Sequence, residues 1–257
     1  MTTISNPLST NDSAVLSALF DAESSPSTNN STTITLDPSL PHLPSITTTD
    51  LQSLQSRELS AIQPLLRPKP TEKIPPTTLR TAITKLSDLI TENPHYASAY
   101  VNRAQAGRML YDGEQEMDGD VSISPFTDLS TAISLLTPPP STTTITTTAS
   151  SSSSRPTSNR LSPHHARLLS TAHTHRAYIL YKASHSHTEI ESLRLPPHLR
   201  SKPLQDLEEL ASADFALGGR YGNEVAREMA VRTNPYAKMC GGIVRGAIRG
   251  ELEGFVL

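Results

Sequence analysis

Apolar residues recur at three- and four-residue steps in several separate stretches of the chain, and this spacing predicts amphipathic helices. The boundaries coincide with helix signals, such as Pro75 and Pro76 at a first turn and Asn93-Pro94 at an end. No alternating apolar pattern is long enough to predict a sheet. We therefore expect an all-α protein with helices at 11–20, 50–63, 75–93, 96–111, 125–136, 163–184, 204–217 and 224–250, the last interrupted near Asn234-Pro235.

Polar stretches rich in proline, serine and threonine separate these helices. About a quarter of the chain is serine or threonine, and such a composition offers too little apolar surface to offset the entropy of ordering. The run at 141–159 is the extreme case, and we expect it to be disordered. The predicted organisation is a mostly disordered segment 1–48 with a short helix near 11–20, a helical domain 49–250 interrupted by loops 112–124, 137–162 and 185–203, and a tail 251–257.

The helices at 75–93 and 96–111 fit the template of a tetratricopeptide repeat. The first helix of that repeat needs an aromatic residue and a small residue four positions later, as at Tyr100 and Ala104. The second helix needs a small, a bulky and a small residue with a proline beyond them, and Ala82, Leu86, Leu89 and Pro94 come close to this, although Leu89 is larger than usual. Two more units fit if their loops are longer, with Leu129 and Ala132 joined to Ala104, and with Ala211, Phe215 and Gly218 joined to Ala177. The alternative is a bundle of unrelated amphipathic helices.

Four segments resemble the tetratricopeptide repeat protein 36 family, and they lie at 11–16, 97–106, 211–227 and 233–240. The segment Thr233–Cys240 is the most specific, because Asn-Pro-Tyr-Ala followed closely by Cys is not part of the general repeat pattern. The resemblance implies a short solenoid of three helix pairs that has no catalytic residues and takes part in protein association. It also implies a connection with the Hsp70 chaperone or with tyrosine breakdown.

In such a solenoid the first helix of each repeat lines the concave face. Residues at steps of three and four would form two exposed stripes there, which are our candidate binding residues: Ser98, Asn102, Gln105 and Met109, then Thr171, His175, Tyr178 and Lys182. The alternative is a merely solvated face. Asn102 matches the asparagine of the clamps that hold acidic Hsp70 tails, but Glu58 and His175 stand where basic partners are needed. We therefore expect no such clamp.

No pattern of catalytic or metal-binding residues stands out. His173 and His175 are two positions apart on a helix and point away from each other, and no cysteine or carboxylate stands at ligand spacing. Cys240 is expected to be a small buried hydrophobe beside Met239 and Ile243. A nucleophile elbow and a phosphate-binding glycine loop are both missing from the sequence. We expect neither an enzyme nor a protein that holds a cofactor or a metal.

Glycines at 242, 246, 250 and 254 recur every four residues and form one face of the last helix. We expect this face to let the helix cap the third repeat closely as far as Ile248, and the alternative is a frayed tail.

The net charge of −3 at a pI near 6.3 gives no drive toward nucleic acid or an anionic membrane. The single cysteine and the absence of a secretory pattern at the start favour an intracellular, most simply cytoplasmic, protein. The primary hypothesis is a monomeric adaptor that binds a protein partner, with Hsp70 as one candidate. The alternatives are a regulatory protein of tyrosine or aromatic amino-acid catabolism and a structural subunit of a larger complex.

Overall fold

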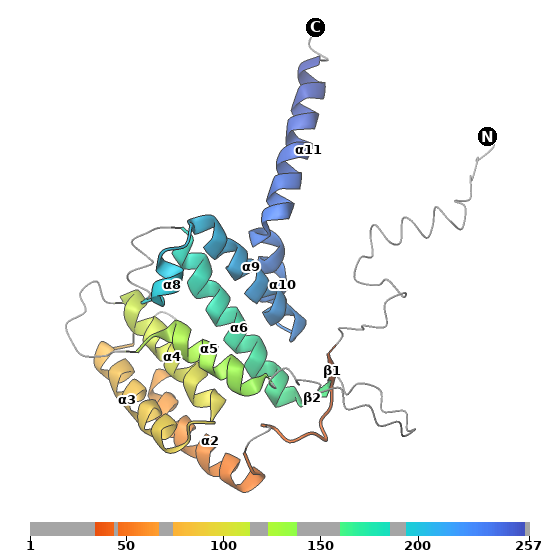
Figure 1. The fold of residues 1–257 in the computed structure, drawn as a ribbon. Coiled ribbons are helices and arrows are strands. Elements are labelled where there is room, and N and C mark those ends of the chain that lie inside the picture. Colours follow the sequence, from red (N-terminus) through yellow and green to blue (C-terminus); the bar gives the residue numbers. More distant parts are fainter. Residues whose placement is uncertain are drawn as a thin grey trace, which may run out of the picture. The chain divides into compact units, whose positions relative to one another are not determined.

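The computed structural model describes residues 34–43, 46–66, 74–113, 123–137, 160–185 and 194–254, and most of these residues are helical (Figure 1). This confirms a predominantly α-helical protein. The elements are β1 (Thr35–Leu36), α2 (Thr48–Ile62), the 3-10 turn η1 (Gln63–Leu65), α3 (Pro76–Glu92), α4 (Ala97–Gly113), α5 (Pro125–Leu136), β2 (Arg160–Leu161), α6 (Pro163–Ala183), α8 (Pro197–Arg200), α9 (Leu204–Arg220), α10 (Glu224–Thr233) and α11 (Pro235–Gly254).

Most helices begin at capping side chains or prolines, which is why their positions agree with the sequence-based expectation. The Ser124, Ser162 and Asn223 side chains accept hydrogen bonds from backbone N–H groups in the first turns of α5, α6 and α10. Proline occupies the first turn of α3, α5 and α6, where its missing N–H leaves no bond unmade. These local signals mark the start of these helices, and the Ser124 and Ser162 hydroxyls also donate to distant carbonyls, those of Arg194 and His42.

Each long helix from α2 to α10 packs against the next long helix along the chain, and α4 also contacts α6 (Figure 1). One apolar cluster runs through this stack and contains Leu86, Ala104, Leu129, Ala177 and Phe215. Leu86 and Ala177 are fully buried, and Ala104 is 1% exposed. Small residues at such positions let neighbouring helix axes come close. Consecutive helix packing around one continuous core is therefore the architecture of the described stack.

The backbones of two helices approach closely at the junction of α9 and α10, and not on α11. A Cβ atom on Gly219 would stand 2.9 Å from the Cα of Arg227, so the backbones leave no room for a side chain there. By contrast, a Cβ on Gly242 or Gly246 would meet nothing within 4 Å. The expectation that the glycine face of the last helix packs tightly on the third repeat is therefore wrong. Helix α10, and not α11, packs on α9 at this junction.

Three smaller features differ from the sequence-based expectation. Residues 34–43 belong to the ordered fold, since Leu43 is 3% exposed and β1 pairs in parallel with β2. Each of these strands has only two residues, which is too short for an alternating pattern to show. The expected loop 185–203 contains the helix α8 with the buried Leu199.

The expected helix near 11–20, the run 141–159 and the last residues of the expected tail lie outside the described residues. Among the helices that the structure describes, none combines the length and apolar character that crossing a membrane requires.

Candidate functional site

The four candidate residues on α4 do not form an exposed stripe. Ser98 is buried, so the expected exposure is wrong for this residue. Asn102 is half-buried and donates a hydrogen bond to Glu58 on α2, at 2.7 Å. Gln105 is half-buried and is hydrogen bonded to His175 on α6, at 3.0 Å. Met109 packs against a second small apolar cluster between α3 and α4. The α4 stripe mainly joins neighbouring helices to one another.

The candidate residues on α6 are more accessible. Tyr178 is 40% exposed, and the guanidinium of Arg108 on α4 lies 5.0 Å from its ring centre. Thr171 and Lys182 are half-buried, and the Thr171 hydroxyl donates to a carbonyl of its own helix. The structure therefore brings Gln105, His175 and Tyr178 into one region between α4 and α6. Of the eight candidates, Tyr178 is the most accessible to a partner.

Burial changes the protonation of this region. The pKa of His175 is lowered to about 4, first by burial of the imidazole and then by the positive charge of Arg108. His175 is therefore neutral at physiological pH, and a neutral ring can share a hydrogen bond with the Gln105 amide.

Asn102, which matches the asparagine of acidic-tail clamps, is already bonded to a carboxylate of its own chain. Glu58 is 7% exposed and accepts hydrogen bonds from the Asn102 amide and from the Tyr96 hydroxyl, the latter at 2.5 Å. Burial, together with the charge of Glu58, raises the pKa of Tyr96, which keeps the phenol protonated as a donor. An incoming acidic tail would have to displace Glu58 from both donors.

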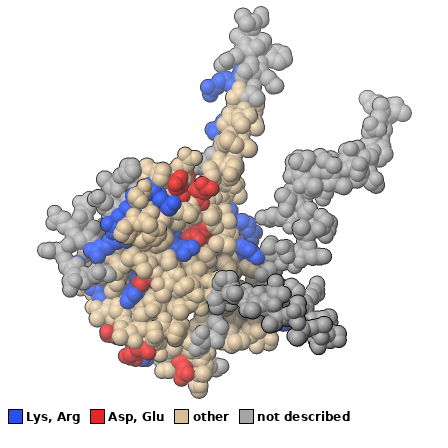
Figure 2. All heavy atoms as spheres, in the orientation of Figure 1, with Lys and Arg blue, Asp and Glu red and all other residues tan. Residues whose placement is uncertain are grey.

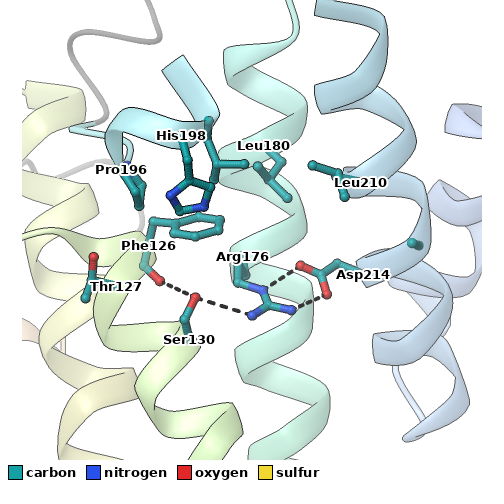
Figure 3. Close-up of a pocket in the computed structure, with 11 residues that line it drawn as sticks. Phe126, Thr127, Ser130, Arg176, Leu180, Pro196, His198, Leu210 and Asp214 are labelled. Atoms are coloured by element: carbon teal, nitrogen blue, oxygen red, sulfur yellow. Dashed lines mark hydrogen bonds and ion pairs between the residues drawn. The ribbon is translucent and has the colours of Figure 1, made fainter. Parts of the chain in front are cut away.

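A cluster of arginine, aspartate and serine occurs twice in the stack with the same connections. Arg103 donates through Nε and Nη2 to the two carboxylate oxygens of Asp128, at 2.8 and 2.6 Å, and through Nη1 to Ser87, at 3.1 Å. In the second copy Arg176, Asp214 and Ser130 make the same three bonds, at 2.6, 2.7 and 3.3 Å (Figure 3). Each arginine directly precedes a template alanine, Ala104 or Ala177. Each cluster joins three helices.

The two aspartates differ because only the second has a histidine partner. The Nδ1 atom of His173 lies 3.0 Å from Asp214, and this contact is buried. Burial raises the pKa of Asp214, but the bonds from Arg176 and His173 outweigh it and leave that pKa below its usual range. At Asp128 burial is opposed by Arg103 alone, and the pKa is raised. His173 is thus part of the ion-pair cluster, whereas His175 faces α4.

Some expectations about reactive residues can be checked directly. Cys240 is exposed, so its expected burial is wrong, and its neighbours Met239 and Ile243 are 58% and 65% exposed. Across the described ranges, no group of three or more histidine, cysteine or carboxylate side chains is placed to hold a metal ion.

Helix α11 carries the most extensive exposed apolar surface in the described part of the chain. Five of its large apolar side chains are more than half exposed: Tyr236, Met239, Ile243, Val244 and Ile248. They recur at steps that place them on one broad side of the helix, whereas Arg245 and Arg249 lie opposite. Figure 1 shows α11 continuing beyond α10, and among the described helices only α10, at its start, is drawn beside it. Contiguous exposed apolar surface of this extent is uncommon on monomeric proteins.

The described fold is that of an α-helical protein in which helices pack in chain order and the last described helix is amphipathic and exposed. No protein-family model matches the chain, and no solved structure does. The chain is 42% identical, over 267 aligned residues, to the L-tyrosine degradation gene cluster protein hmgX of Aspergillus fumigatus. The alignment spans 97% of this chain and 95% of that relative. The chain belongs to the same protein family as hmgX.

The sequence alone did not reveal the two arginine clusters. Their members are separated by 25 residues between Arg103 and Asp128 and by 38 between Arg176 and Asp214, and each gap crosses one of the loops expected to interrupt the helical domain. A signal was nevertheless present. Asp128 and Asp214 both directly precede a bulky template residue, at Leu129 and Phe215. Aligning the repeat units would have placed these charges in equivalent positions.

Proposed function

We propose that this protein is a non-catalytic accessory protein of L-tyrosine breakdown that acts by binding another protein. The observation that carries the proposal is the similarity to hmgX, which extends over nearly the whole of both chains. A shared role is more plausible when the whole protein is shared than when one common module is. This moves the regulatory role in tyrosine catabolism ahead of the chaperone adaptor.

The proposal includes a repeat architecture of the tetratricopeptide type, with membership of the tetratricopeptide repeat protein 36 group. Two observations support it. Neighbouring long helices pack in chain order, with α4 also touching α6, as stacked helix pairs do. The clusters around Arg103 and Arg176 recur with the same three bonds at equivalent template positions. A repeated internal contact is difficult to explain in a bundle of unrelated helices.

Within this proposal, α11 is the docking element for the partner. Most of the stability of a helix in a protein comes from packing of its apolar face, and each interior glycine costs about 1 kcal/mol relative to alanine. Gly241, Gly242 and Gly246 all lie inside α11, and its apolar side is exposed. A partner that covers this side would stabilise the helix as it binds. We assign that partner to the enzymes of aromatic amino-acid breakdown.

Affinity purification from cells grown on L-tyrosine tests the proposal. The wild-type chain should enrich an enzyme of aromatic amino-acid breakdown. Ile243→Asp should reduce its recovery at least tenfold, because the charge enters the apolar side of α11. Leu59→Asp is the matched control, since Leu59 is 55% exposed on α2, and it should retain wild-type recovery.

Three results would count against the proposal. Recovery of chaperones alone would contradict the assignment to tyrosine breakdown. Equal recovery by Ile243→Asp would contradict the role of α11. Turnover of a tyrosine-derived compound by the purified chain would contradict a non-catalytic role.

A further inference from the structure

The second arginine cluster lies beside a cavity of about 630 Å³. In the first cluster, the Arg103 guanidinium lies 5.7 Å from the ring centre of Tyr100 on the same helix. In the second cluster His173 occupies the position that corresponds to Tyr100, and its ring is hydrogen bonded to Asp214. No aromatic ring of α6 therefore covers the Arg176 guanidinium. This guanidinium lines the cavity (Figure 3).

The walls of this cavity come from four helices and include the insert that the repeat template does not explain. Phe126 of α5, Leu180 of α6 and Leu210 of α9 supply apolar surface. The insert adds His198 and Leu199 of α8, with Leu199 buried and His198 exposed at the rim. Figure 2 shows several basic residues, with acidic residues among them, on the face in view. The cavity thus has an apolar body, a charged floor and a histidine at its mouth.

The floor retains hydrogen-bonding capacity. A guanidinium has five N–H donors, and Arg176 uses three of them, two on Asp214 and one on Ser130. One donor remains on each terminal nitrogen, which suits the two oxygens of a carboxylate. Asp214 also lines the cavity, and its hydrogen bonds to Arg176 and His173 offset part of the repulsion between its charge and a second carboxylate. The ring of Phe126 lies 5.9 Å from the Arg176 guanidinium and offers a flat apolar contact beside the donors.

We infer that this cavity binds a small aromatic carboxylate. The ring of the ligand packs against Phe126, Leu180 and Leu210, and its carboxylate accepts hydrogen bonds from Arg176, with His198 at the mouth. The volume lies in the range of small-molecule sites, which are mostly apolar with a few polar groups that orient the ligand. This site is separate from the protein partner of the proposed function, and it would make the protein responsive to a metabolite.

Isothermal titration of the full chain with phenylacetate tests the inference. The wild type should bind one equivalent saturably, and the neutral isostere 2-phenylacetamide should bind at least tenfold more weakly. Leu210→Trp should weaken phenylacetate binding at least tenfold by filling the mouth, since Leu210 is 39% exposed and tolerates a larger side chain. Leu59→Trp, on the exposed side of α2, is the matched control and should bind as the wild type does.

A second variant tests the donor directly. Arg176→Lys keeps the charge but loses the planar fork, so it should weaken phenylacetate binding and narrow, without erasing, the preference for phenylacetate over the amide. If that variant fails to fold, the Leu210→Trp comparison still decides. Three results would overturn the inference: no saturable binding by the wild type, equal affinity for acid and amide, or unchanged affinity in Leu210→Trp. None of them would alter enzyme recovery through α11, so the two proposals fail separately.

Discussion

Acid should destabilise this protein partly through one histidine at the contact between α4 and α6. The pKa of His175 is about 4 in the folded chain, against an ordinary value of 6.5, because burial and Arg108 disfavour the charged ring. Between these values the unfolded chain binds more protons than the folded chain, so stability falls as the pH falls. Between about pH 7 and about pH 5 this linkage lowers the free energy of unfolding by roughly 2 kcal/mol. Because the ring is partly exposed, the expected loss is closer to about 1 kcal/mol.

The assay is urea unfolding at both pH values for the wild type and for His175→Gln. Glutamine can keep a hydrogen bond to Gln105 but does not titrate, so the variant should lose about 1 to 2 kcal/mol less than the wild type on acidification. His164 and His165, whose pKa values burial also lowers, remain in both proteins and cancel in the comparison. His185→Gln, at an exposed position, is the control. An identical pH dependence in His175→Gln and the wild type would refute the reasoning.

Three further predictions concern packing and recognition. Arg103→Met should lower the free energy of unfolding by about 3 kcal/mol in urea titrations, because it leaves Asp128 buried without its cation. Gly219→Ala should cost about 1 to 3 kcal/mol by pushing α10 away from α9, whereas Gly242→Ala, in open space, should raise the helicity seen by circular dichroism. A peptide ending in the acidic Hsp70 tail should bind weakly or not at all in a fluorescence anisotropy titration, and low-micromolar binding abolished by Asn102→Ala would contradict this.

The helices could be predicted from the sequence because their signals are local. A serine before the first turn of α5 or α6 and a proline inside that turn act on neighbouring backbone groups, whatever the rest of the chain does. The helix α8 was missed because four residues are too few to show a period. The strands β1 and β2 were missed because two-residue strands are defined only by their pairing across the fold.

Burial proved harder to predict than helix position, since it depends on which elements meet. Ser98 and Cys240 were assigned the wrong exposure for the same reason: helical spacing gives the faces of a helix but not its neighbours. The glycines of α11 were expected to mark a close contact, yet the close contact is the one between Gly219 of α9 and Arg227 of α10. The cavity above Arg176 depends on an insert that the repeat template leaves out.

The most direct test of the central claim is growth on L-tyrosine as the only carbon source. In a strain that lacks the gene, the wild-type chain should restore growth, whereas a chain with Ile243→Asp on the apolar side of α11 should not, although it accumulates to the same level. Full growth of the Ile243→Asp strain, or normal growth without the gene, would contradict a protein that serves tyrosine breakdown through a partner held by α11.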